Sequence, residues 1–399
     1  MNFWETSVKS NMPTGNMMKA LSVNKIYLFY FCSMFFIFSM GLWSEAFISL
    51  VNKANLLKWT LFISLMPIFF IHKKFRISCA FNYASLGMFG FIFVTAISTI
   101  TSSYLDNEGF QNLLGYLTIW ILAFLLPVYS STDKMHVLLF NSIGIVSTVT
   151  VLLGLLLITS FDGWGGARFR GVFHNTNMLG STGVIASIYT LTMYSKLKNK
   201  LFLALLICSL ISIFLTQSRG ALVAALVFLT IQIFQNMNVK KVVSILFIGL
   251  FLLSLTHLIK SNSDDSSFQP REFKTSLDPA RVAILNRHTE LFIEKPFLGQ
   301  GLSGDINGGR FAAELAYTDI LSFSGLIGGS TFIFVLFLST LLGCKIRSTQ
   351  SVEANGNYFI FISVLLLSIG DGYISNLGNP LPLFAWFYIA TLARSLNGR

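Results

Sequence analysis

The sequence predicts an all-α, polytopic membrane protein with about twelve transmembrane helices and one long external loop between the ninth and tenth. Only 11% of the 399 residues are charged and 54% are hydrophobic, whereas soluble domains carry roughly 25% charged residues. Apolar runs long enough to cross about 30 Å of hydrocarbon recur along the whole chain. A water-soluble fold of this composition would expose apolar patches far larger than soluble monomers tolerate.

Twelve apolar windows of roughly 18–20 residues qualify as spans. They cover 26–44, 57–71, 79–101, 112–130, 137–159, 178–194, 201–217, 221–237, 242–259, 316–343, 357–373 and 381–393. The chain therefore divides into an N-terminal segment (1–25), spans one to nine (26–259), a polar loop (260–315) and spans ten to twelve with a short C-terminus (316–399). The first 25 residues do not have the form of a cleavable signal peptide, so we expect the first span to stay as an anchor.

The distribution of basic residues predicts the orientation. An even number of spans puts both termini on one side, and with that side inside, more than half of the 28 Lys and Arg residues fall in cytoplasmic segments. The positive-inside rule therefore predicts cytoplasmic termini and an external 260–315 loop. Because this distribution accounts for the net charge of +11, we expect membrane lipid and no nucleic acid as a partner.

The segment after the fifth span combines glycines with arginines on the external side. Residues 165–171 contain three glycines together with Arg168 and Arg170, and Asn177 follows. Glycines allow close approach of a ligand, and guanidinium groups present forked donors suited to phosphate oxygens. The alternative is an interfacial loop whose arginines contact lipid headgroups.

Arg219 lies between two apolar runs that have almost no loop between them. A charge at this depth costs a few kcal/mol unless it lines a wet cavity or has a counter-charge. Its expected partner is an anionic ligand, or else a carboxylate such as Glu314. A structural ion pair is the alternative.

The long external loop is the third candidate site. Helical spacing predicts a helix over Pro279 to Phe297, which carries Arg281 and Arg287. Glu314 and Asp319 are the carboxylates at the entrance to the tenth span. Desolvation raises the pKa of a carboxyl group and makes it a better general base; either acid could instead start a helix or form a salt bridge. We find no Asp-x-Asp cluster and expect neither a metal ion nor a cofactor.

Four short elements follow one another in a recognisable order. An Arg-x-x-Gly-x-Phe-x-x-x-Asn element reads Arg168 to Asn177, and a Ser-Arg-Gly-Ala element reads Ser218 to Ala221. In the loop, Arg281 precedes a Pro-hydrophobic-hydrophobic-Gly-x-Gly element at Pro296 to Gly301, and Gly-Leu-Ile-Gly follows at Gly325 to Gly328. Over residues 160–330 the chain thus resembles the O-antigen ligase and O-antigen polymerase superfamily.

The resemblance implies a metal-independent glycosyltransferase. Members of the superfamily transfer or polymerise glycans carried on undecaprenyl pyrophosphate at the periplasmic face of the bacterial inner membrane. The long loop would then be periplasmic, the substrates undecaprenyl-pyrophosphate-linked glycans, and a polysaccharide chain-length regulator a further partner. In this interpretation Glu314 and Arg219 are catalytic. The expected substrate-binding residues are Arg168, Arg170, Asn177, Arg281, Arg287, Tyr317 and Asp319.

One departure from the family pattern favours a Wzy-type polymerase over a WaaL-type ligase. In ligases a His-Asn pair usually stands eleven residues before the first glycine of the Gly-Leu-Ile-Gly element, and here Glu314 is followed by Leu315. Polymerases vary at this place and often carry acidic residues there. The alternatives are a ligase that transfers glycan to lipid A–core and a lipid-linked-sugar transporter. A transporter site would lie near the midplane between repeated halves, whereas these ionisable residues gather on one face.

Overall fold

The structure is a bundle of α-helices with one small hairpin. The computed structural model describes residues 14–53, 57, 60, 82–102, 106–125, 132–165, 168–236, 279–303, 316–347, 351–375 and 379–397. Its longer helices are α1 (Thr14–Met40), α3 (Tyr83–Ile100), α4 (Asn107–Trp120), α5 (Thr132–Leu155), α6 (Thr176–Leu197), α7 (Lys200–Thr216), α8 (Arg219–Asn236), α10 (Pro279–Glu294), α12 (Ala316–Arg347), α13 (Val352–Gly370) and α14 (Pro380–Asn397). Strands β1 (Trp164–Gly165) and β2 (Arg168–Phe169) pair antiparallel, with Gly165 opposite Arg168.

Four of the described helices are long and apolar enough to cross a membrane. They lie at Tyr83–Ile100, Asp133–Leu155, Ala316–Lys345 and Val352–Gly370, and shorter apolar helices lie at Tyr27–Met40, Lys200–Thr216 and Arg219–Gln232. Phe93 on α3 and Phe334 and Phe337 on α12 are exposed. Large apolar side chains on an outer helix face suit contact with lipid tails. The protein is therefore an all-α, multi-pass membrane protein.

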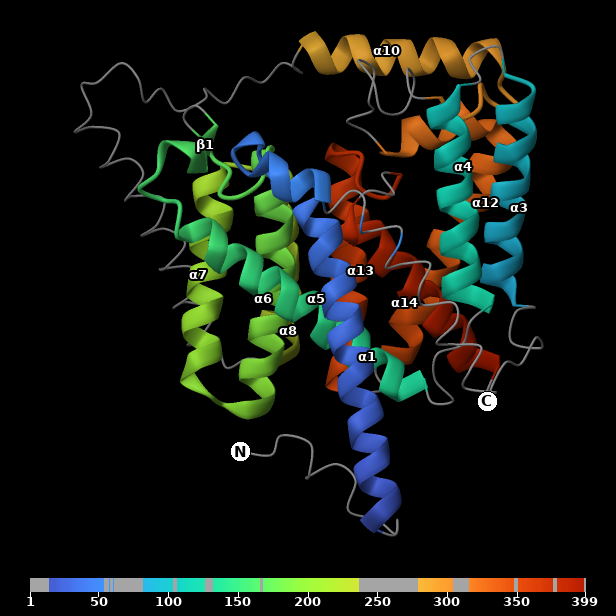
Figure 1. Cartoon of the computed structure of the whole chain (residues 1–399). Coiled ribbons are helices and arrows are strands. Elements are labelled where there is room, and N and C mark those ends of the chain that lie inside the picture. The colour runs from blue at the N-terminus through green and yellow to red at the C-terminus, as the bar shows by residue number, and fades with distance from the viewer. Residues whose placement is uncertain are drawn as a thin grey trace.

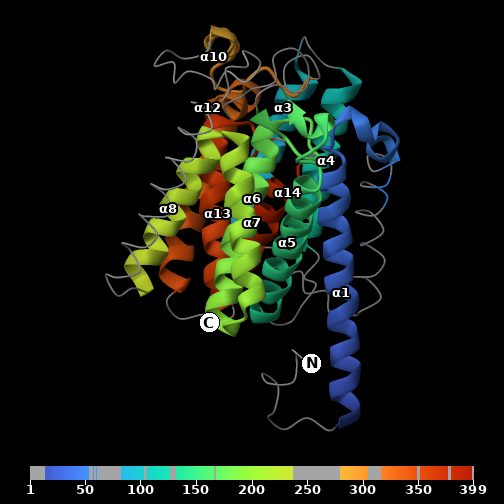
Figure 2. The same cartoon turned by 90° about the vertical axis from the view of Figure 1, so that its left-hand side faces the viewer.

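In the part of the chain that the structure describes, helices overlap ten of the twelve predicted spans. The span at 242–259 lies outside the described residues, as does nearly all of the span at 57–71. The first helix begins at Thr14, well before the apolar span predicted from residue 26. Apolar composition predicts only where a helix crosses hydrocarbon, and α1 continues beyond the bundle (Figure 2).

Helix α14 forms the centre of the bundle. Leu383, Phe384, Ala385 and Trp386 are fully buried, and α14 contacts α5, α12 and α13. A helix that is apolar on all sides is expected to be buried in protein rather than exposed on one face. The polar residues described below are therefore carried by helices around a rigid core.

The loop segments that carry the candidate residues gather at one end of the bundle. Helix α10 lies across this end, above α3, α4 and α12, and the β1 hairpin lies at the same end (Figure 1). The first turns of α1 and the turn between α6 and α7 lie at the opposite end. The helix predicted in the long loop is confirmed at Pro279–Glu294, where it packs on α12. The hairpin and α10, which carry several of the candidate residues, thus lie at the same end of the bundle.

Candidate functional site

The segment between α5 and α6 is fixed to the end of α1 by aromatic packing and backbone hydrogen bonds. Trp43 pairs with Phe173 in an antiparallel bridge, and Phe173 and Phe169 are buried. Gly171 has φ +58°, and an added Cβ there would lie 2.9 Å from the Cα of Gly154. Only glycine fits this left-handed position and close approach. The hairpin that carries the predicted arginines therefore has a rigid base.

Arg168 is held by two hydrogen bonds to different elements. Its Nε donates to the carbonyl oxygen of Thr216 (2.9 Å), and its Nη2 donates to Oδ1 of Asn177 (2.9 Å). Thr216 ends α7, and the C-terminal carbonyls of a helix attract cations. The first and last residues of the Arg-x-x-Gly-x-Phe-x-x-x-Asn element are thus in direct contact. Arg170, which is half-buried, donates from its Nε to the carbonyl oxygen of Asp162 (3.1 Å).

The turn between α7 and α8 lies against the first turns of α6. An added Cβ at Gly180 would lie 2.9 Å from Cβ of Ala221 and 3.0 Å from Cβ of Ser218. The Oγ of Ser218 accepts a hydrogen bond from the amide of Ala221 (3.5 Å) at the start of α8. Arg219 is the exposed first residue of α8. A cation at a helix N-terminus opposes the helix dipole, so this position favours an anion nearby.

Asp371 joins this cluster from a distant part of the sequence. Its Oδ1 accepts a hydrogen bond from Nδ2 of Asn177 (2.9 Å). The Tyr373 hydroxyl is hydrogen-bonded to the side chains of Asp371 and Ser181. Burial and the charge of Asp371 raise the pKa of Tyr373 well above its usual value, so this hydroxyl keeps its proton. Asp371 is therefore held by α6 and by its own turn.

The same turn contacts the predicted carboxylate of α12. Asp319 is only 5% exposed, and its carboxyl group is hydrogen-bonded to the side chain of Ser375. The Tyr116 hydroxyl donates to the carbonyl oxygen of Ser375 (3.0 Å). Tyr317 donates from its hydroxyl to the carbonyl oxygen of Leu365 on α13 (3.2 Å). Residues 371–375 thus link the arginine-bearing side of the site to the first turns of α12.

The two glycine-rich elements of the long loop and α12 bind each other through their backbones. The amide of Leu326 donates to the carbonyl oxygen of Pro296 (2.7 Å), and the amide of Gly301 donates to that of Phe323 (2.9 Å). Gly325 has φ +63° and interrupts the helical geometry of α12. An added Cβ at Gly299 would lie 2.5 Å from the backbone nitrogen of Gly325. These glycines therefore permit close backbone contact, and we call residues 296–301 and 323–327 the glycine lock.

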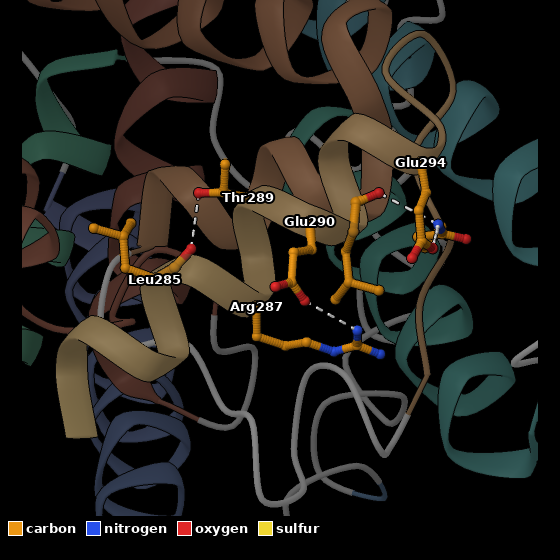
Figure 3. Close-up of polar contacts among 7 residues, drawn as sticks. Leu285, Arg287, Thr289, Glu290 and Glu294 are labelled. Atoms are coloured by element: carbon orange, nitrogen blue, oxygen red, sulfur yellow. Dashed lines mark hydrogen bonds and ion pairs between the residues drawn. The ribbon is translucent and has the colours of Figure 1, made fainter. Parts of the chain in front are cut away.

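Helix α10 carries two of the predicted loop residues. Arg287 is 35% exposed and pairs with Glu290 on the same helix, with Nη1 3.4 Å from Oε2 (Figure 3). His288 is buried, and its Nδ1 lies 2.8 Å from Oγ of Ser322 on α12. Arg281 lies in the first turn of α10, but its side chain, like the whole of Glu314, lies outside the described residues.

The contacts around Arg168 and Arg219 favour binding of an anion. The N-terminal turns of α6 and α8 are adjacent because Gly180 lacks a side chain, and exposed amide groups at helix N-termini bind phosphate oxygens. Arginine adds a permanent charge and bidentate geometry to such a site. The structure brings together Arg168, Asn177 and the turn that precedes Arg219. Asp319 is joined to this cluster through Ser375 of the 371–375 turn, and Tyr317 contacts Leu365 on α13.

Asp371 is a residue of this cluster that was not among the candidates predicted from the sequence. It lies within the predicted span 357–373, whereas α13 ends at Gly370. An ionisable residue inside a predicted span is by itself a signal of a functional site. That signal was present in the sequence and would have pointed to Asp371.

Comparison with known proteins gives one finding that bears on identity. No curated protein matches the chain. Residues 203–333, from α7 to the first half of α12, match the model of the family described as O-antigen ligase. This range contains Arg219, the glycine lock and Asp319. The match supports the O-antigen ligase and polymerase superfamily, whose members are glycosyltransferase-like membrane enzymes.

Proposed function

We propose that the protein is a Wzy-type polymerase of a surface polysaccharide such as O-antigen. It joins oligosaccharide repeat units that are carried on undecaprenyl pyrophosphate, without a metal ion. The observation that carries this proposal is the contact of Arg168 with the start of α6 and the end of α7, beside the start of α8. Such an arrangement suits a pyrophosphate group, and the family match supports the same class of enzyme.

The reaction requires cations that stabilise the charge of the leaving pyrophosphate and a base that takes the proton of the acceptor hydroxyl. An acceptor hydroxyl of the incoming repeat unit attacks the anomeric carbon of the growing glycan, and the bond to pyrophosphate breaks. Arg168, Arg170, Arg219 and Arg281 stabilise the negative charge on the departing pyrophosphate. Glu314 takes the proton from the acceptor hydroxyl. The elongated glycan then remains on the carrier of the incoming unit, and undecaprenyl pyrophosphate is released.

The remaining candidates would contact the sugars or the carrier headgroup. Arg287, Tyr317 and Asp319 lie near the α10 end of the bundle in α10 and α12. Asp319 and Tyr317 also bond to Ser375 and Leu365, and these contacts would fix how the two side chains meet the acceptor sugar.

A ligase is the second candidate, because the matched family is described by that activity. A ligase transfers the finished glycan from the carrier to lipid A–core. The same arginines would stabilise the same leaving group, so the two activities differ only in the acceptor. Glu314, where ligases usually have histidine, favours the polymerase.

Lipopolysaccharide banding of a deletion strain separates these activities. We expect loss of the ladder, with a single repeat unit kept on the core, and recovery of the ladder on complementation. Complete loss of antigen, with polymer accumulating on the carrier lipid, would instead assign the ligase activity. An unchanged ladder would contradict both.

We also propose an inner-membrane location with the α10 end in the periplasm and both termini in the cytoplasm. Thr289 on α10 and Asn199 in the α6–α7 turn are exposed at opposite ends of the bundle. Cysteine at position 289 should react with an impermeant thiol reagent in intact spheroplasts, and cysteine at position 199 should not. The reverse pattern would overturn the orientation.

Arg219→Lys should remove most of the polymerisation activity although the charge is kept. A lysine ammonium cannot reproduce the bidentate contacts of a guanidinium with phosphate oxygens. The measurement is ladder formation by the complemented deletion strain at matched membrane protein levels. Lys200→Arg, at the opposite end of the bundle, is the control and should leave the ladder unchanged. A normal ladder from Arg219→Lys would reduce Arg219 to a structural role.

A further inference from the structure

Both the oxygen and the nitrogen of the Asn177 side-chain amide form hydrogen bonds with charged side chains. Its Oδ1 accepts from Nη2 of Arg168 (2.9 Å), and its Nδ2 donates to Oδ1 of Asp371 (2.9 Å). Asn177 lies in the first turn of α6, where its backbone amide donates to the side chain of Asn175. A residue whose amide is occupied in this way is poorly suited to bind a sugar directly.

The donor and acceptor capacities of the guanidinium, the amide and the carboxylate fix how the amide is oriented between the other two groups. A guanidinium only donates hydrogen bonds, an ionised carboxylate only accepts them, and a primary amide does both. The amide oxygen must therefore face Arg168 and the amide nitrogen must face Asp371. The opposite orientation would set donor against donor and acceptor against acceptor. An asparagine is the residue that fits between these two charged partners at this distance.

We call this chain of hydrogen bonds, from Arg168 through Asn177 to Asp371, the relay. It fixes the plane of the Arg168 guanidinium. One edge is held by the carbonyl oxygen of Thr216 at the end of α7, and Nη2 is held by Asn177. Asp371 is in turn hydrogen-bonded to Tyr373, which also contacts Ser181 of α6. The orientation of Arg168 thus depends on a residue 194 positions from Asn177 in the sequence.

We propose that Asn177 and Asp371 are positioning residues that orient Arg168 toward the pyrophosphate. This inference rests on the proposed function, and it changes the role of Asn177 from substrate contact to relay. Displacing a positioned group by about 1 Å can cost roughly 100-fold in rate. Both residues therefore act on the reaction through Arg168.

An exchange of the two side chains tests the relay. Asn177→Asp sets two carboxylates against each other, and Asp371→Asn removes the charge that orients the amide. Each single variant should reduce polymerisation by at least about tenfold, through kcat more than KM. In the double variant Asn177→Asp/Asp371→Asn, the new carboxylate accepts from both Arg168 and the new amide, so activity should return to within about threefold of wild type. Non-additive recovery of this kind is the signature of a direct pair.

Two measurements are made on the wild type, the two single variants and the double variant. Together they separate a failure of this inference from a failure of the proposed function. The first is polymerisation of lipid-linked repeat units extracted from the deletion strain, and the second is the thermal unfolding midpoint of the detergent-purified protein. Recovery by the double variant in both supports the relay. Recovery of the unfolding midpoint without recovery of kcat would make the contact purely structural and overturn the positioning role.

The remaining outcomes are also decisive. If neither readout recovers in the double variant, or if both single variants behave as wild type, the relay is wrong. A wild-type protein that polymerises nothing contradicts the proposed function, and the unfolding midpoints still measure the coupling between positions 177 and 371. Asn199→Asp is the matched control, because Asn199 caps α7 at the opposite end of the bundle and aspartate caps equally well. It should change neither readout.

Discussion

Glu314→Gln should lower polymerisation by about 10²–10⁴-fold, the usual contribution of general-base assistance. The glutamine side chain has nearly the same shape as glutamate but cannot take up the acceptor proton. Binding of the carrier should survive because the arginines are unchanged. The measurement is the rate of chain extension by purified protein on lipid-linked repeat units, together with carrier binding at equal protein concentration.

Asp319→Asn is the matched control for the carboxylate at position 314. Asp319 is buried and hydrogen-bonded to Ser375, and an asparagine oxygen can accept the same hydrogen bond. Its effect should therefore be much milder. Normal extension by Glu314→Gln combined with an inactive Asp319→Asn would identify Asp319 as the base. Normal extension by both would leave only the arginines as the source of catalysis.

Gly299→Ala should destabilise the protein by about 2–5 kcal/mol, the sum of the cost of a left-handed residue with a side chain and the cost of overpacking. Gly299 has φ +76°, and an added Cβ would lie 2.5 Å from both the Gly325 nitrogen and the Phe323 carbonyl carbon. Both of these are backbone atoms and cannot move aside as a flexible side chain would. We expect a lower thermal unfolding midpoint and a lower yield of monodisperse protein in detergent.

Gly90→Ala, on the face of α3 that packs against α12, provides the comparison. An added Cβ at Gly90 would meet only Cγ2 of Thr331, at 3.7 Å, which is an ordinary contact distance. This variant should unfold at the wild-type temperature or slightly above it, because alanine favours helix. Equal midpoints for Gly299→Ala and Gly90→Ala would show that the glycine lock does not contribute to stability.

The sequence was sufficient for the helices but not for the partners of the polar side chains. The length of an apolar run predicts a membrane helix well, because a helix must be long and apolar enough to cross the hydrocarbon of the bilayer. The helical spacing in Pro279 to Phe297 correctly predicted α10. The elements Pro296 to Gly301 and Gly325 to Gly328 are two of the four motifs recognisable in the sequence, yet nothing in their spacing shows that their backbones bind each other.

The contact between Asn177 and Asp371 illustrates the limit more sharply. It joins residues 194 positions apart, and such pairing depends on how α6 and α13 pack, which a single sequence does not reveal. The contact between Arg168 and Asn177 joins residues only nine positions apart, so one short motif contains both partners. Glu314 stays a prediction, because it lies outside the described residues.

The contacts of the glycine lock with α3 can form only late in synthesis, because they join segments that lie far apart in the chain. Ser98 of α3 donates to the carbonyl oxygens of Gly299 and Phe323, which lie 201 and 225 positions later in the chain. Helix α3 therefore enters the membrane long before its partners leave the ribosome. Asp371 follows both of these residues in the chain, so its contact with Asn177 forms later still. Until α13 and the turn after it have been made, a nascent chain therefore holds Arg168 without the contact between Asn177 and Asp371.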